Sequence, residues 1–210
     1  MNIDVKQFPL GPLQTNCYFL GCTTTKQAAI IDPAWNGSEL AKYVLDAGYT
    51  LTHILLTHTH FDHIGGLADL KTAIDAPIYV HPEAVQMMKF GATSAQRFGI
   101  TMPDAPPADE MLAAGDVIQV GDLTLDVLFT PGHAPGHVSF YLKSHHILFD
   151  GDVLFQRSIG RTDLPGGNFT ELMDSIQTVL MPLPDETQVL SGHGPITTIG
   201  DERQHNPFLQ

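Results

Sequence analysis

Three histidines and one aspartate lie within a single short stretch of this chain, as His58, His60, Asp62 and His63. Imidazole nitrogen and carboxylate oxygen are ligands that Zn²⁺ and Fe²⁺ accept, whereas a thiolate-rich structural site would need cysteines that this stretch lacks. One isolated histidine is usually a core residue with ordinary hydrogen-bond partners. Four metal-ligating side chains so close together instead predict a metal site.

The same order of residues recurs downstream, where an apolar run and a small-residue turn precede His133, Asp152 and His193. The first cluster also follows an apolar run, at residues 54–56. Ligand sites in open α/β sheets collect at the carboxyl ends of strands. The recurrence therefore predicts several strand ends that converge on one place.

Short apolar or alternating runs predict strands at residues 16–20, 27–31, 53–56, 77–80, 117–120, 123–128, 137–142, 146–150 and 188–190. Helical spacing predicts helices around residues 40–47, 67–74 and 172–179. Sheets with helices outside them are the expected architecture, in the α/β or α+β class.

Local signals add three expectations about connections. Gly121 and Asp122 predict a tight hairpin turn. Asn168, three residues before Glu171, predicts the start of the last of these helices. Residues 91–114 combine prolines, alanines and glycines without a clear period, so we expect an irregular surface segment there.

The composition, 43% apolar and 16% charged, suits one globular domain over residues 1–210. A net charge of −13 argues against a nucleic-acid or anionic membrane partner. The sequence shows no targeting segment or membrane span, so a cytoplasmic protein is expected. Cys17 and Cys22 are expected to be small buried side chains rather than a redox pair. The oligomeric state is left open.

The motifs T-H-T-H-F-D-H, P-G-H-A-P-G-H, the Asp152 turn and G-H-G resemble, in this order, those of the metallo-β-lactamase-fold hydrolases. The resemblance implies a four-layer αβ/βα sandwich of two mixed sheets with outer helices, and metals at one edge between the sheets. It implies a first ion held by His58, His60 and His133. It implies a second ion held by Asp62, His63 and His193, with Asp152 bridging the two.

Other residues of these motifs have different implied roles. Asp32 matches a position that supports the metal loop without ligating, and His137 matches a structural position. The remaining histidines match no ligand position: His53, His81, His145, His146 and His205.

The implied centre is suited to hydrolysis of a polarised carbonyl. Two divalent ions carry more positive charge than Asp62, Asp152 and a bridging hydroxide remove, so the centre stays positive. Metal coordination generates hydroxide at neutral pH, and Asp62 could orient it by accepting its hydrogen bond. Zinc is the expected metal, with iron and manganese as alternatives.

Among branches of this family, the sequence is most similar to glyoxalase II (hydroxyacylglutathione hydrolase) through residues 151–155 and 160–163. Arg161 stands where that branch has a lysine that contacts glutathione. The implied substrate is a small thioester, such as S-lactoylglutathione or another S-2-hydroxyacylglutathione, whose thiolate departs without protonation. The chain ends at Gln210 without the branch's helical C-terminal glutathione-binding domain, and Asp163 replaces a tyrosine. It therefore resembles a short form, with an open choice of thiol carrier.

Three alternatives remain open. A persulfide dioxygenase of the same superfamily would use His58, His133 and Asp152 to hold one Fe²⁺. A lactonase would share the hydrolytic centre. A non-enzymatic scaffold is disfavoured, because structural zinc sites are closed four-ligand cages and seven ligands for two ions leave open positions.

Overall fold

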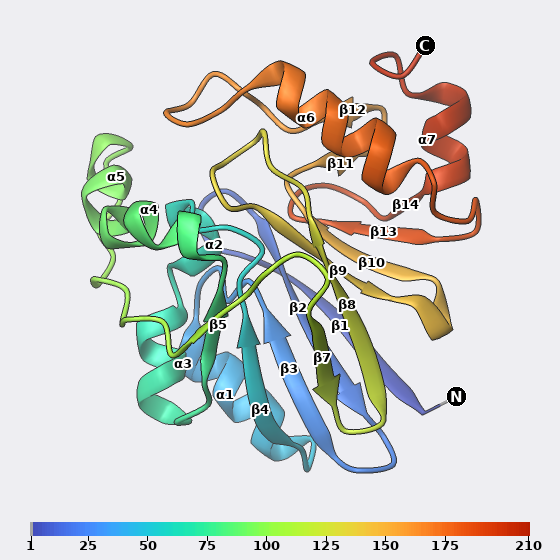
Figure 1. Cartoon of the computed structure of the whole chain (residues 1–210). Coiled ribbons are helices and arrows are strands. Elements are labelled where there is room, and N and C mark those ends of the chain that lie inside the picture. Colours follow the sequence, from blue (N-terminus) through green and yellow to red (C-terminus); the bar gives the residue numbers. More distant parts are fainter. Residues whose placement is uncertain (1) are drawn as a thin grey trace.

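The computed structural model describes residues 2–210, and a mixed sheet with the strand order β1-β2-β3-β4-β5-β6 forms its first half (Figure 1). The first three strands are antiparallel, and β3 to β6 run parallel to one another. The strands are β1 (Ile3–Leu10), β2 (Thr15–Cys22), β3 (Gln27–Ile31), β4 (Thr50–Leu55), β5 (Ile78–Val80) and β6 (Glu110–Met111).

A second mixed sheet has the order β14-β13-β10-β9-β8-β7, in which β10 and β13 are parallel and the other neighbours antiparallel. Its strands are β7 (Val117–Val120), β8 (Leu123–Phe129), β9 (Val138–Leu142), β10 (Ile147–Gly151), β13 (Gln188–Ser191) and β14 (Thr197–Thr198). A small ribbon lies apart from both sheets and pairs β11 (Leu154–Phe155) with β12 (Ser158–Ile159).

The helices are α1 (Gly37–Asp46), α2 (Phe61–Ile64), α3 (Leu67–Ala73), α4 (Val85–Lys89), α5 (Gly91–Arg97), α6 (Phe169–Ser175) and α7 (Ile199–His205). A π-helical turn, Ile176–Leu180, extends α6. Short 3₁₀ turns lie at Pro82–Ala84 and Lys143–His145.

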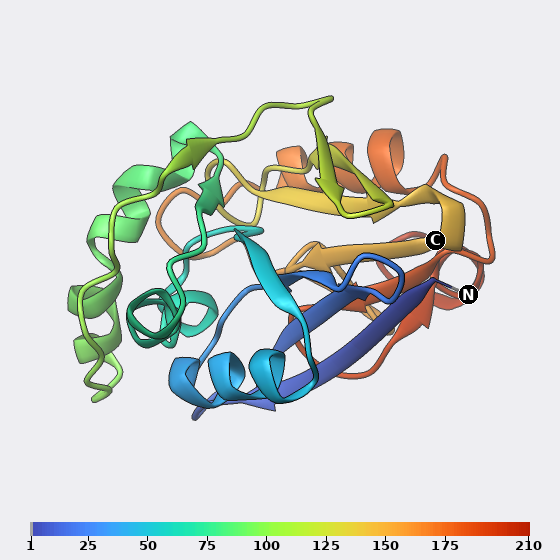
Figure 2. The ribbon, with the colours of Figure 1, turned by 90° about the horizontal axis from the view of Figure 1, so that it is seen from below.

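Alternation of side chains along the strands builds three apolar layers. Phe19 in β2 packs with α1 and α3 on the outer face of the first sheet, whereas its neighbour Leu20 packs between the sheets. On the second sheet, Leu148 faces α6 and Phe149 faces the first sheet. The two sheets therefore lie between outer helices (Figure 2). This confirms the expected four-layer αβ/βα sandwich.

All nine predicted strands are present, with ends shifted by a few residues. The Gly121 turn joins β7 to β8, since Val120 pairs with Leu123 across it and Gly121 takes the positive φ that such turns favour. Asn168 begins α6 by accepting a hydrogen bond from the backbone N–H of Glu171 at 3.2 Å. Both local predictions are confirmed.

The prediction of an irregular segment at residues 91–114 is wrong over its first part, which forms α5, and at β6. Helix α5 buries Gly91 and Ala95, and Gly91 lies close to Ile64 of α2. Strand β1 was missed because it is a half-exposed edge strand whose burial does not alternate cleanly. Cys17 and Cys22 are buried free thiols, as expected. Over residues 2–210, every helix is too short or too polar to cross a membrane.

Candidate metal centre

The predicted ligands lie at the carboxyl ends of strands from both sheets. The cluster of residues 58–63 follows β4 of the first sheet, while His133, Asp152 and His193 follow β8, β10 and β13. These last three strands run in the same direction, because β8 and β10 are both antiparallel to β9 and β13 is parallel to β10. Their carboxyl ends therefore meet at one edge. The structure brings all seven predicted ligands together there.

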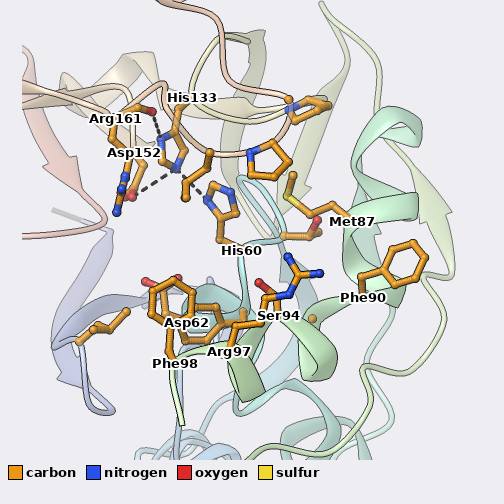
Figure 3. Close-up of a pocket in the computed structure, with 18 of the residues that line it drawn as sticks. His60, Asp62, Met87, Phe90, Ser94, Arg97, Phe98, His133, Asp152 and Arg161 are labelled. Carbon is orange, nitrogen blue, oxygen red and sulfur yellow. Dashed lines mark hydrogen bonds and ion pairs between the residues drawn. The ribbon is translucent and has the colours of Figure 1, made fainter. Parts of the chain in front are cut away.

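The first group contains His58, His60 and His133, and one ring nitrogen from each lies within 4.8 Å of the others. His60 Nδ1 lies 2.9 Å from His133 Nε2. His133 Nδ1 donates a hydrogen bond to the backbone carbonyl of Arg161 at 2.8 Å (Figure 3). Since a neutral imidazole carries one N–H, this bond leaves the lone pair of His133 Nε2 directed at the other histidines.

The second group contains Asp62, His63 and His193, whose ligand atoms also lie within 4.8 Å of one another. Asp152 lies between the groups. Its Oδ1 is 3.4 Å from His63 Nε2, and its Oδ2 is 3.5 Å from His133 Nε2 and 3.6 Å from His193 Nε2. One carboxylate thus reaches ligand atoms of both groups, which is the arrangement expected of a bridging ligand.

Asp32 and Thr57 fix the orientation of two of the histidines. Asp32 Oδ2 accepts hydrogen bonds from Thr57 Oγ1 at 2.6 Å and from His63 Nδ1 at 3.0 Å. The Thr57 hydroxyl has donated its proton to Asp32, so its oxygen accepts from His58 Nδ1 at 3.0 Å. In its neutral form each histidine therefore carries its proton on Nδ1 and presents an unprotonated Nε2 to the centre.

The backbone around Asp32 is shaped for this role. Asp32 has φ +50, in the left-handed region that a short polar side chain tolerates, and its Oδ1 accepts from the Thr57 backbone N–H at 2.8 Å. The residue is buried and absent from the opening of the site. Asp32 also has a carboxylate oxygen within 4.8 Å of ring nitrogens of His58 and His63, but both of its oxygens accept hydrogen bonds from Thr57 or His63, which fits the supporting role that the resemblance implied.

His137 supports Asp152 through the backbone. Its Nε2 accepts from the Asp152 N–H at 3.1 Å, and its Nδ1 lies 3.0 Å from Thr130 Oγ1. A Cβ at Gly151 would lie 2.6 Å from His137 Nε2, and the residue has φ +58, so both space and conformation require glycine there. His137 belongs to neither ligand group in the described residues, which agrees with its expected structural role.

Burial and mutual charge set the ionisation of the cluster. Burial lowers the pKa of His58 well below its ordinary value and that of His60 to about 4, so both rings are neutral at pH 7. Burial would raise the pKa of Asp62, but His63 and His193 outweigh it and lower that pKa to about 2. Burial lowers the pKa of His63 and His193, but Asp152 and Asp62 outweigh it and raise both. Because metal binds neutral imidazoles and ionised carboxylates, an ion that binds here must displace protons from these two rings.

Several donor atoms of the centre lack hydrogen-bond partners that a metal ion would replace. Six buried side-chain atoms have no hydrogen-bond partner among the described residues, and three of them are donor atoms of this centre: His58 Nε2, His63 Nε2 and Asp152 Oδ1. Such orphaned atoms are unfavourable unless an ion or water satisfies them. Gly192 leaves space beside them, because a Cβ there would lie 2.2 Å from Asp152 Oδ1. This set of nitrogen and oxygen donors suits Zn²⁺ or Fe²⁺.

A pocket of about 1020 Å³ opens from the centre, and His60, Asp62, His133, Asp152 and His193 line it. Arg161 also lines it, as predicted for a substrate contact. Its guanidinium nevertheless makes two hydrogen bonds to Asp163, at 2.7 and 2.8 Å, and its side chain is 56% exposed. Its role in binding therefore stays a prediction.

Sequence reasoning missed a group of supporting residues at the start of β2. Thr15 Oγ1 donates to Asp62 Oδ2 at 2.8 Å. Asn16 Nδ2 and Tyr18 Oη donate to the Ser191 carbonyl at 2.9 and 2.7 Å, which fixes the loop before His193. These residue types are ordinary in a strand and lie far from the ligand motifs in sequence. No spacing signal could have identified them.

The comparisons with known proteins agree with this geometry. The model of the Metallo-beta-lactamase superfamily matches residues 10–193. A probable metallo-hydrolase, YqgX, from Bacillus subtilis is 42% identical over 97% of this chain and 96% of its own. Hydroxyacylglutathione hydrolase GloC from Haemophilus influenzae is 37% identical over 100% of this chain and 98% of its own.

Two solved structures are also similar along the whole chain. The BLEG-1 B3 metallo-beta-lactamase is 44% identical with a TM-score of 0.92, covering 99% of this chain and 100% of that one. TTHA1623 in a di-iron-bound form is 39% identical with a TM-score of 0.89, covering 97% and 100%. The chain therefore belongs to the metallo-beta-lactamase superfamily, and this membership supports a metal-dependent hydrolase built around the His/Asp cluster.

Proposed function

We propose that the chain is a two-metal thioester hydrolase that acts on S-2-hydroxyacylglutathione, such as S-lactoylglutathione, or on a related thioester. The observation that carries this proposal is a pair of ligand groups that share Asp152 at the end of an open pocket. The relative named hydroxyacylglutathione hydrolase, which matches the chain along its full length, supports the thioester.

His58, His60 and His133 would hold one ion, Asp62, His63 and His193 the other, and Asp152 both. Zinc suits these donors, and the di-iron-bound neighbour supports iron as the alternative. Ions held by these residues would supply the chemistry that ester-type hydrolysis needs, namely a water acidified to a pKa of about 7 and a polarised carbonyl oxygen.

The chain's own residues orient the reactants. Asp62 is ionised and held by Thr15, so it can accept a hydrogen bond from the attacking water and aim its lone pair at the carbonyl carbon. The described lining of the pocket holds no lysine, tyrosine or cysteine, and Glu83 is its one carboxyl group outside the ligand set. A thiolate leaving group needs no proton donor, whereas an amine would.

The proposal includes a contact between Arg161 and the thiol part of the substrate. A glutathione carboxylate would have to displace Asp163 from the guanidinium of Arg161. The gain in binding energy is therefore the difference between the Arg161–glutathione pair and the Arg161–Asp163 pair, which are similar. Replacing Arg161 with alanine should raise KM for a glutathione thioester more than for a thioester without carboxylates. Equal effects on both substrates would remove Arg161 from the binding site.

The decisive experiment measures metal content and turnover on protein purified without added metal. We expect two ions per chain and release of free thiol from S-lactoylglutathione, with both lost together in Asp152→Ala. One iron per chain with persulfide-dependent oxygen uptake would replace the proposal with a dioxygenase. Turnover of a β-lactam or a lactone, with the thioester left intact, would also overturn it.

A further inference from the structure

The wall of the pocket opposite the histidines comes from α4 and α5 (Figure 3). Met87 of α4, Phe90 between the two helices, and Ser94 and Arg97 of α5 all line it. Phe90 and Phe98 are 55% and 56% exposed, although such rings are usually well buried. Apolar rings left open in a concave pocket are typical of a ligand-binding surface.

Arg97 supplies the positive charge of this wall. Arg97 lines the pocket, and its guanidinium points toward the side on which His60 and Met87 are drawn (Figure 3). Among the arginines of residues 2–210, Arg97 is the one whose guanidinium makes no ion pair with a carboxylate. The others are paired: Arg157 with Asp201 and Glu202, Arg161 with Asp163, and Arg203 with Asp185.

An unpaired guanidinium is informative in a chain with a net charge of −13, where carboxylates are abundant. Arginine presents a rigid fork of N–H donors that matches a carboxylate with two parallel hydrogen bonds. The Arg97 side chain is exposed, so a carboxylate bound to it keeps part of its hydration and the pair is weaker than a buried one. The wall therefore combines an apolar surface with one unused site for an anion.

We propose that Arg97 binds a carboxylate at the end of the substrate remote from the reacting carbonyl, and that Met87, Phe90 and Phe98 pack against an apolar segment between the two. The substrate class is then a hydrophobic thioester that carries a carboxylate. This inference rests on the proposed function for the thioester group. A cavity of about 1020 Å³ accommodates a ligand of this kind.

Thioether analogues test the inference without turnover, because they lack the reacting carbonyl. The probes are S-benzyl mercaptopropionate, its carboxamide, and the S-methyl acid, titrated into the metal-loaded protein by calorimetry. Wild-type protein should bind the benzyl acid about 2- to 5-fold tighter than the carboxamide, as expected of an ion pair with an exposed guanidinium. It should also bind the benzyl acid tighter than the methyl acid.

Variants then assign the preference to a residue. Arg97→Ala should abolish the preference for the acid, and Arg97→Lys should keep part of it. The matched control is Lys89→Ala, which removes an exposed cation of α4 outside the pocket lining and should leave the preference intact. Unchanged thermal unfolding of each variant would show that the fold is retained.

Three results would overturn the inference: equal binding of acid and carboxamide to the wild type, a preference that survives in Arg97→Ala, or one that Arg161→Ala removes. The last two would mean that the carboxylate is held elsewhere. The proposed function can fail separately. A protein that shows the Arg97-dependent preference but cleaves no thioester fails only as a thioesterase, and one that cleaves S-lactoylglutathione without the preference fails only here.

Discussion

Asp32→Asn is the most informative substitution behind the metal centre, because it keeps the shape of the side chain and changes one acceptor into a donor. In the native chain, Asp32 accepts three hydrogen bonds from buried groups, two of them at Oδ2. With the amide nitrogen at the Oδ2 position, the Thr57 hydroxyl can turn and accept. His63 cannot, so its proton must move to Nε2, which is the atom directed at the metal.

With the amide reversed, its nitrogen faces the Thr57 backbone N–H, which has no other acceptor. One donor is therefore left facing another donor in either orientation. The loss of one hydrogen bond to a charged group corresponds to about 1.5–3 kcal/mol. In the first orientation the loss weakens metal binding about 10- to 100-fold. In the second it lowers the free energy of unfolding of the metal-free protein.

Two measurements separate these cases. Competition with a chelator gives the metal affinity, and urea unfolding of the metal-free protein gives its stability. Asp69→Asn, on the exposed side of α3, is the matched control and should change neither. If the metal affinity of Asp32→Asn stays within twofold of wild type and its stability within about 0.5 kcal/mol, the tautomer argument is wrong.

Three other perturbations probe the site and the fold. In Gly192→Ala the new methyl group would lie 2.2 Å from Asp152 Oδ1, so chelator competition should show weaker metal binding. The control is Gly194→Ala, whose methyl group would have no atom within 4 Å. Because Gly194 has φ +76, this variant should lose only stability, by about 1 kcal/mol. Glu202→Ala removes a fully buried carboxylate that accepts hydrogen bonds from three residues. Its free energy of unfolding in urea should fall by about 3–5 kcal/mol. Glu186 is exposed, and the free energy of unfolding of Glu186→Ala should stay within about 0.5 kcal/mol of wild type. Stripping the metal should lower the free energy of unfolding by about 4 kcal/mol at an ion concentration of a thousand Kd, and an unchanged midpoint would contradict the metal centre.

The sequence was most informative where an apolar strand ends in a rare combination of residues. The strand before Asp152 is buried on both faces and reads as an apolar run. The strand before His133 alternates between buried and less buried side chains, and the strand before His58 is buried mainly at its carboxyl end. Turn residues mark the end of each. Histidines and aspartates gathered at those ends have little reason to be there except to bind metal, because burying them without a partner is costly. The resemblance then supplied which strand ends meet, and local pattern alone could not have done so.

Two parts of the site gave no such signal. Thr15 is the first residue of β2 and follows the turn from β1, an edge strand that is half exposed and hard to recognise. Helix α5 buries only the small residues Gly91 and Ala95, while Ser94 and Arg97 line the pocket, so the helix has no stripe of large apolar side chains. A helix that buries small side chains on one face and lines a pocket with another thus lacks the apolar pattern by which helices are predicted from sequence.

The pocket wall formed by α4 and α5 contacts the metal-ligand loop through Phe61. Phe61 lies between the predicted ligands His60 and Asp62 in sequence, and its ring packs against Phe98 with centroids 5.2 Å apart. Replacing Phe98 with a smaller residue would remove apolar surface from the pocket and also the packing that supports Phe61 in the ligand loop. Its effect on substrate binding could therefore not be separated from its effect on metal affinity. Arg97 precedes Phe98 but has its charge in the pocket and no side-chain partner among the described residues. Replacing it changes the charge of the wall and leaves that support in place, which is why Arg97 separates substrate selection from metal binding.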